Sequence, residues 1–244
     1  MNWFQAFSMA LELAPKFLGW DLNSPQAQET DSAGNTMLND KDLALLNIKR
    51  KAGSVTVVVG TRETGKTELC YRYAEFLDRP TYAVSPQQRP PAWITWMQLE
   101  DVLERLPSKC TLILDDIPAY MSNRDYNEAF SRVVEKAVPM VRHEKQPPDY
   151  PIGEVHLIFS TQSTAQADRY ILDADIAFFK PLGLLMDDIE RPSIAKIYRN
   201  VVNPEFDGHD DYFIQRHAYM MSRSYKGLIE VSQAKGHART EAGA

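Results

Sequence analysis

The sequence predicts an α/β fold in which a mainly parallel central sheet is flanked by helices. Short runs of apolar and β-branched residues alternate along the chain with stretches whose apolar residues recur at helical spacing. This alternation is typical of a parallel sheet that is covered on both faces. With 244 residues, of which 44% are hydrophobic, the chain can bury a substantial core. The expected strands are residues 54–59, 80–84, 110–114, 154–161, 175–180 and 225–232.

Helical periodicity predicts the elements between these strands. A short helix over residues 41–49 leads to the first strand, and another helix follows residue 67. Pro139 is expected to kink one later helix and Pro192 to interrupt another, because proline has no N–H to donate. The later helices are expected at residues 95–106, 126–143, 187–202 and 210–221.

The first 20 residues form an amphipathic pattern that leaves two interpretations open. They contain no basic segment and no small-residue cleavage site, so we do not interpret them as a signal peptide. The helix either packs on the flank of the domain or docks on a membrane surface or partner, although interfacial helices usually carry several lysines. Residues 21–40 are expected to be a linker and residues 233–244 a flexible tail. One helical face collects Phe4, Phe7, Leu11, Ala14 and Leu18.

Composition limits the classes of protein to which this chain can belong. No run of 18 apolar residues occurs, so no membrane span is expected. Cys70 and Cys110 are the two cysteines, and their apolar surroundings predict core thiols of a reducing compartment. The formal net charge of −6 is not typical of a nucleic-acid-binding protein, although a ring-shaped assembly can present local basic loops.

The most informative stretch follows the first expected strand and reads G-x-x-x-x-G-K-T, the pattern of a phosphate-binding loop. The glycines allow successive N–H groups to turn toward a phosphate. Lys66 can reach the β- and γ-phosphates, and the Thr67 hydroxyl can bind Mg²⁺. The helix that opens at Lys66 adds its positive end. We therefore predict a site for ATP and Mg²⁺ at Gly60, Thr61, Arg62, Glu63, Thr64, Gly65, Lys66 and Thr67.

A second signal is the pair of acids that ends the strand expected at residues 110–114. Asp115 would arrive beside the phosphate-binding loop, where it can hold Mg²⁺ through water, and Asp116 can orient or deprotonate the attacking water. Two acids at the start of a helix are also common for electrostatic reasons alone. Downstream of a phosphate-binding loop, we interpret Asp115 as a metal ligand and Asp116 as a catalytic residue.

A third motif indicates which family of phosphate-binding-loop proteins the sequence resembles. Residues 156–162 read H-L-I-F-S-T-Q and resemble the "HLVxATQ" strand of the FtsK–HerA-type ATPases, which move double-stranded DNA and include viral genome-packaging enzymes. The resemblance covers about residues 54–181 and implies a P-loop NTPase fold of the RecA/ASCE-like type over residues 41–232. It also implies that this strand lies between the two nucleotide-site strands and that Gln162 senses the γ-phosphate.

The family also implies an arginine that acts on ATP bound to a neighbouring subunit. Arg142 holds the matching position, and Arg132 and Arg169 are the alternatives. Two departures from the family pattern are the long Pro-rich insertion at residues 143–153 and the use of Asp116 where glutamate is commoner.

Three classes of function follow. The leading one is an ATP-driven motor that translocates double-stranded DNA, most like a viral packaging ATPase because the chain is short; it implies a ring, expected to be a hexamer, in the host cytoplasm or the virion. Residues 1–20 are then a candidate contact with a capsid vertex or a membrane. The alternatives are a small-metabolite kinase and a nucleotide-gated scaffold. Arg124 and Lys136 are candidate DNA contacts and equally candidate surface charges.

Overall fold

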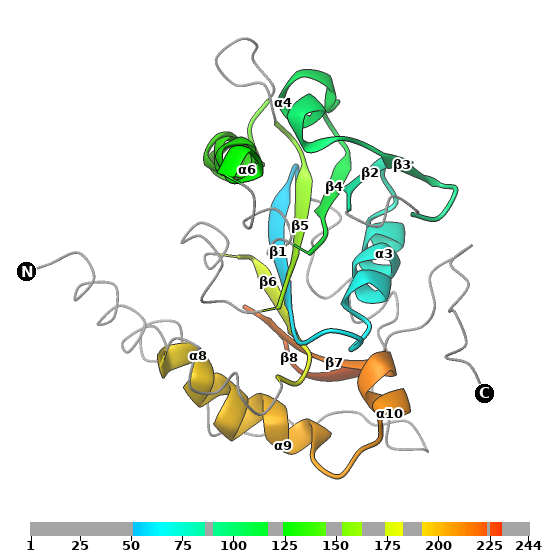
Figure 1. Ribbon diagram of the computed structural model, residues 1–244, viewed down its shortest axis with the longest axis vertical. Coiled ribbons are helices and arrows are strands. Elements are labelled where there is room, and N and C mark those ends of the chain that lie inside the picture. The colour runs from blue at the N-terminus through cyan, green and yellow to red at the C-terminus, as the bar shows by residue number, and fades with distance from the viewer. Residues whose placement is uncertain are drawn as a thin grey trace, which may run out of the picture.

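The computed structural model describes residues 51–85, 90–116, 124–144, 153–162, 174–182, 192–223 and 225–230. Within them lies an eight-stranded sheet with the order β3-β2-β4-β5-β1-β6-β7-β8 (Figure 1). Its strands are β1 (Ser54–Val59), β2 (Thr81–Val84), β3 (Ile94–Trp96), β4 (Thr111–Leu114), β5 (His156–Thr161), β6 (Ile176–Phe179), β7 (His217–Ser222) and β8 (Lys226–Glu230). The predicted α/β class is confirmed.

The first six strands are parallel, and the last two are antiparallel additions. β5 pairs with β1 on one side and with β4 on the other, in both cases in parallel. β6 pairs in parallel with the free side of β1. β7 then runs antiparallel to β6, and β8 runs antiparallel to β7. The carboxyl ends of β4, β5 and β1 therefore lie side by side at one edge of the sheet.

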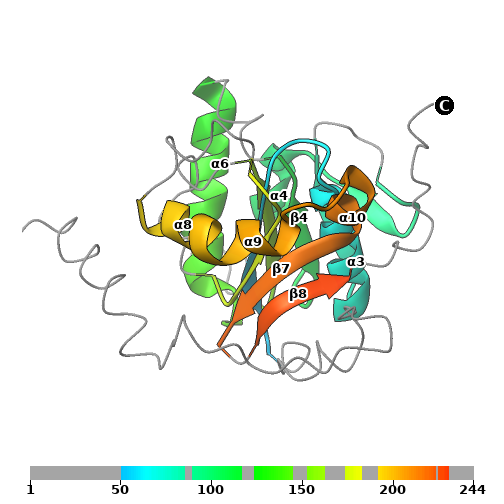
Figure 2. The same ribbon diagram turned by 90° about the horizontal axis from the view of Figure 1, so that it is seen from below.

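Helices cover both faces of the sheet because alternate residues of its strands point to opposite sides. On one face, Val58, Ile113 and Ile158 pack with the apolar residues of α3 (Lys66–Leu77). On the other, Val57 and Phe159 pack in a second core with α6 (Arg124–Ala137). Figure 2 shows α3 and α6 on opposite sides of the strands. The second core also receives α4 (Val102–Arg105), the π-helix η5 (Tyr198–Val202) and α9 (Asn203–Phe206).

Two expected helices are partly wrong. Residues 95–106 begin in β3, then form the 3-10 turn η2 (Leu99–Asp101) and the short helix α4. Residues 210–221 form only α10 (Asp211–Arg216) before β7 begins. In both places a neighbouring strand offers pairing partners: Ile94 pairs with Thr81, and Met220 pairs with Phe178. Pairing and burial determine the local structure there, because strand propensity depends strongly on context.

Pro139 acts differently from the expectation. Pro139 lies in the 3-10 turn η3 (Val138–Met140), which ends α6 rather than kinking it. Pro192 lies at the start of the described part of α8 (Pro192–Ile197), and the predicted helical residues 187–191 before it lie outside the described residues. Cys70 and Cys110 are buried free thiols, as expected. Across the described parts of the chain, no helix is long and apolar enough to cross a membrane. Residues 1–50 and 231–244, with the predicted helices at residues 1–20 and 41–49, the linker and the tail, lie outside the described residues.

Candidate functional site

The site is built where three adjacent parallel strands end. β1 leads into residues 60–67, β4 into Asp115 and Asp116, and β5 into Gln162. Open parallel sheets bind ligands at this carboxyl edge, because the chain leaves the sheet there and its loops are free to diverge. The three sequence signals therefore meet at one place.

Residues 60–67 form a tight loop between β1 and α3. Gly65 has φ of 83°, a left-handed conformation that favours glycine, and it precedes the first residue of α3. No side chain caps this end of the helix, which leaves the first N–H groups of α3 and their positive end to an anion. A methyl group on Gly60 would lie 2.4 Å from Cβ of Lys180, so only glycine fits at the start of the loop.

Lys66, Thr67 and Asp115 form the charged part of the site. The Lys66 ammonium donates to the carbonyl oxygen of Thr61 at 2.6 Å, and the Thr67 hydroxyl donates to Asp115 Oδ2 at 3.0 Å. Burial lowers the pKa of Lys66, against the opposing effect of the nearby carboxylates. Burial also raises the pKa of Asp115, although the hydroxyl groups that donate to it oppose this shift. Both charges are thus held partly desolvated at the edge of the sheet.

Asp116 is held by two residues of the neighbouring strand β5. Its N–H donates to Ser160 Oγ at 2.8 Å, and Gln162 Nε2 donates to its Oδ1 at 3.0 Å. Its φ of 55° is uncommon for a residue with a side chain. The amide of Gln162 therefore fixes the carboxylate of Asp116, and this pair can accept a proton from a water molecule or orient it.

Ser160 is a positioning residue that the sequence reasoning did not single out. Its hydroxyl donates to Asp115 Oδ1 at 2.5 Å and accepts from Asp116 N–H, so one buried side chain fixes both acids. A signal for it was present: a serine interrupts the buried strand β5 two residues before Gln162. Buried hydroxyls in such strands need partners, and the neighbouring strand β4 ends in carboxylates.

Lys180 is the second residue that was missed. It follows β6, its side chain is fully buried, and its ammonium donates to the carbonyl oxygens of Ile214 and Gln215, each at 3.0 Å. Its N–H donates to the carbonyl oxygen of Val59, next to Gly60. Lys180 thus ties the last turn of α10 to the start of the 60–67 loop. A lysine at the end of an apolar strand was the available signal.

Arg142 is not brought to this cluster. It follows η3 and pairs with Asp175 at the amino end of β6, which is the opposite edge of the sheet. Asp175 also accepts from Lys51 Nζ and from Val55 N–H. The Arg142 side chain keeps 56% of its surface exposed, and its action on a neighbouring subunit stays a prediction. Of the alternatives, Arg132 is exposed on α6, and Arg169 lies outside the described residues. Lys136 is also exposed on α6, whereas the side chain of Arg124 is not described.

The donor set fits a cation held jointly with phosphate. Within the described residues, no group of three or more His, Cys, Asp or Glu side chains could hold a metal by itself. Thr67 and Asp115 supply a hydroxyl and a carboxylate oxygen in hydrogen-bond contact. Oxygen ligands of this kind, few in number, suit Mg²⁺, which keeps several waters and is completed by substrate phosphates.

Comparison with known proteins adds little to this geometry. No protein-family model matches the sequence, and no curated protein matches it. Among solved structures, one similar fold is the cytoplasmic domain of the Thermomonospora curvata Type VII Secretion ATPase EccC. The TM-score is 0.45 at 11% sequence identity, and the match covers 79% of this chain and 27% of that chain. This chain thus corresponds to about a quarter of that protein, and a likeness at this TM-score carries no functional argument.

Proposed function

We propose that this protein is a P-loop ATPase that hydrolyses Mg·ATP to move double-stranded DNA during the packaging of a viral genome. The observation that carries the proposal is the convergence of residues 60–67, Asp115, Asp116 and Gln162 at the carboxyl edge of three adjacent strands. The order β4-β5-β1, with the glutamine strand in the middle, also agrees with the resemblance to FtsK–HerA-type ATPases.

The 60–67 loop supports nucleotide binding by its shape and charge. The left-handed Gly65 and the uncapped start of α3 suit an anion, and the Lys66 ammonium lies beside them. Thr67 and Asp115 would hold Mg²⁺, which supplies charge neutralisation to the phosphates. The lowered pKa of Lys66 shows the cost of burying its charge in this structure, a cost that a bound polyanion would offset.

Asp116 and Gln162 supply the water-directed part of the site. Asp116 is positioned by Ser160 and Gln162, so its carboxylate can accept a proton from the attacking water without first finding its orientation. A glutamine in contact with this base can report the state of the γ-phosphate to the strand that carries it. In a ring, expected to be a hexamer, Arg142 would act on the site of a neighbouring subunit.

The experiment is a measurement of ATP hydrolysis by the full-length protein with and without long double-stranded DNA. We expect stimulation that is indifferent to DNA sequence and falls steeply with salt, because a translocase holds phosphates rather than bases. Lys66→Ala should lose turnover by about 10²–10³-fold, as expected for removal of a group that stabilises transition-state charge. Lys196→Ala, an exposed lysine on α8, is the matched control and should retain turnover.

The outcomes separate the classes of function. Turnover that needs Lys66 but ignores DNA would favour a kinase or a nucleotide-gated scaffold, and phosphate transfer to a small acceptor would identify the kinase. Turnover that survives Lys66→Ala at the wild-type rate would place the nucleotide site elsewhere. Stimulation that persists at high salt, or that depends on one DNA sequence, would contradict the translocase.

A further inference from the structure

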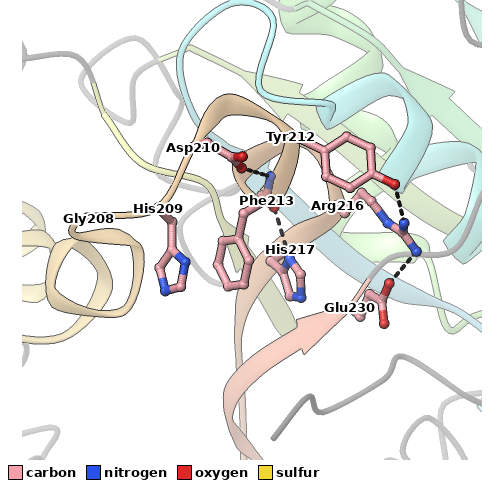
Figure 3. A pocket seen from close by; sticks show the side chains of 8 residues that line it. All are labelled: Gly208, His209, Asp210, Tyr212, Phe213, Arg216, His217 and Glu230. Atoms are coloured by element: carbon pink, nitrogen blue, oxygen red, sulfur yellow. Dashed lines mark hydrogen bonds and ion pairs between the residues drawn. The ribbon is translucent and has the colours of Figure 1, made fainter. Parts of the chain in front are cut away.

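A pocket lies beside the 60–67 loop, between α10 and the antiparallel strands β7 and β8. Its volume is about 480 Å³, within the range of small-molecule sites. Figure 3 shows its lining: His209, Phe213 and His217 stand in a row, and Tyr212, Arg216 and Glu230 lie beside them. Gly208 and Asp210 complete the lining. None of these residues belongs to the site described above.

His217 places an unsatisfied acceptor in this lining. Its Nδ1 lies 2.9 Å from the carbonyl oxygen of Phe213, which can only accept, so Nδ1 carries the proton. Burial lowers the pKa of His217, which keeps the ring neutral at pH 7. Nε2 is then a lone-pair acceptor, and it is buried with no hydrogen-bond partner among the residues that the structure describes. The residue itself is only 6% exposed. A buried acceptor without a donor is costly, and a ligand N–H would satisfy it.

Apart from Gly208 and Asp210, whose Oδ1 accepts from the Phe213 N–H, the rest of the lining is aromatic or internally neutralised. The Phe213 ring stacks on His209 and on His217, each at a centroid distance of 3.7 Å and nearly parallel. The Arg216 guanidinium pairs with Glu230 and donates to the Tyr212 hydroxyl. The rings of His209 and Tyr212 are exposed, so each offers a face to a flat ligand. This lining suits an uncharged aromatic ring with an N–H donor better than a free ion.

The pocket is fixed to the 60–67 loop. A methyl group on Gly65 would lie 2.6 Å from the carbonyl oxygen of Gln215, so the end of α10 touches the loop directly. Lys180 clamps the same turn from the other side through Ile214 and Gln215. His217 follows two residues later, at most about 7 Å along the chain. The end of α10 therefore contacts the loop and also lines the pocket through Arg216, although no residue of the loop itself lines the pocket.

We propose that this pocket binds the purine base of the nucleotide, with His217 Nε2 accepting a hydrogen bond from the amino group at ring position 6. This inference rests on the proposed nucleotide site at residues 60–67. It selects adenine, because guanine carries a carbonyl oxygen at ring position 6, and two acceptors facing each other repel. A site built around an unmet acceptor rejects a ligand that lacks the matching donor.

The test compares ligands that differ in one group. The full-length protein is assayed for kcat/KM and for Kd with ATP, with GTP and with purine riboside triphosphate, which lacks the exocyclic amine; inorganic tripolyphosphate serves as the base-free competitor. Wild type should favour ATP over purine riboside triphosphate by roughly tenfold, the value of one such hydrogen bond. His217→Phe keeps a flat ring without the acceptor, and should abolish that preference while tripolyphosphate still competes equally well.

Two further variants protect the test against misfolding. His143→Phe, at an exposed histidine near the opposite edge of the sheet, makes the same substitution and should keep the full preference. His209→Ala removes an exposed ring and should weaken ATP and purine riboside triphosphate alike, without changing their ratio. An unchanged ATP preference in folded His217→Phe, or no preference in wild type, would overturn the inference and leave the hydrolysis proposal standing. Base-selective binding without hydrolysis would support the inference and overturn the proposed function.

Discussion

Charged side chains have different partners at the two edges of the sheet, where the parallel strands begin (the amino edge) and end (the carboxyl edge). At the amino edge, Asp175 accepts from Lys51, Arg142 and the N–H of Val55, so its charge is neutralised locally. At the carboxyl edge, Asp115 is 4% exposed, and within the described residues its carboxylate is held by hydroxyl groups and a nearby ammonium; burial raises its pKa. The carboxylate at the amino edge therefore has cationic partners, whereas the carboxyl edge keeps the partly desolvated charges of Asp115 and Lys66 close together.

Backbone conformation does not distinguish the two edges, because Lys109 and Glu154, which lie before β4 and β5 at the amino edge, also have positive φ. Glu63, Gly65 and Asp116 all have positive φ, and all three lie at the carboxyl edge next to the desolvated charges. What distinguishes the amino edge is that its backbone acceptors have side-chain donors: the Arg79 guanidinium alone donates to the carbonyl oxygens of Lys51, Ala52 and Glu154. The comparison indicates that the carboxyl edge is shaped for a ligand and the amino edge for stability.

The substitution Arg142→Ala is the most severe test of this comparison, because a large loss of activity would give a residue of the amino edge a role in catalysis. As a finger acting on a neighbouring subunit it would contribute about 10³–10⁵ in rate, and lysine would not replace it. We expect Arg142→Ala and Lys66→Ala to be inactive alone and to recover part of the ATPase activity when mixed before assembly. If co-assembled mixtures recover nothing, Arg142 serves only the Asp175 ion pair, and the amino edge is purely structural.

Asp116→Asn should lower kcat by about 10²–10⁴, because it removes the proposed base and keeps the shape of the side chain. Binding of Mg·ATP should be retained, and this can be measured by equilibrium titration with a non-hydrolysable analogue. Asp115→Asn should instead weaken binding and its dependence on Mg²⁺. Equal metal-binding defects in the two variants would remove the distinction between a metal ligand and a base.

Ser160→Ala should lower kcat by about tenfold, because both acids lose the hydroxyl that positions them. Ser160→Thr keeps the hydroxyl and should restore part of the rate. The matched control is Ser54→Ala, which removes a buried hydroxyl from the amino end of β1, where it lies 2.7 Å from His156 Nδ1. That control should lower the melting temperature and leave kcat unchanged. A normal kcat in folded Ser160→Ala would show that Ser160 does not position the two acids for catalysis.

The smallest effect concerns pH and the amino edge. Burial lowers the pKa of His156 to about 3, so unfolding lets this ring take up a proton between pH 6.5 and pH 3. Stability should therefore fall as the pH drops through that window, by at most about 1.4 kcal/mol per pH unit from this residue. His156→Gln should flatten the curve of unfolding free energy against pH. Identical slopes for the variant and wild type would show that His156 is protonated in the folded protein or that it contributes nothing.

Sequence reasoning reached the parts of the fold that local pattern determines. The buried β-branched run of β1, the acids that follow β4 and the glutamine that follows β5 each carry their own signal, so the strands that lead to the predicted site residues were placed correctly. β3 and β7 were missed because their residues become strands through pairing with β2 and β6, which no local periodicity reveals. Ser160 and Lys180 depend on contacts between distant segments, with Asp115 across strands and with α10.

The most direct test of the account asks which edge of the sheet binds nucleotide. Amide hydrogen exchange of the full-length protein is measured with and without a non-hydrolysable Mg·ATP analogue. We predict protection of residues 60–70 and of Asp115 and Asp116, with little change in residues 153–157 and 174–177 at the amino edge. Lys66→Ala should lose the protection. Protection confined to the amino edge, or none at residues 60–70 under saturating analogue, would contradict the assignment of the nucleotide site.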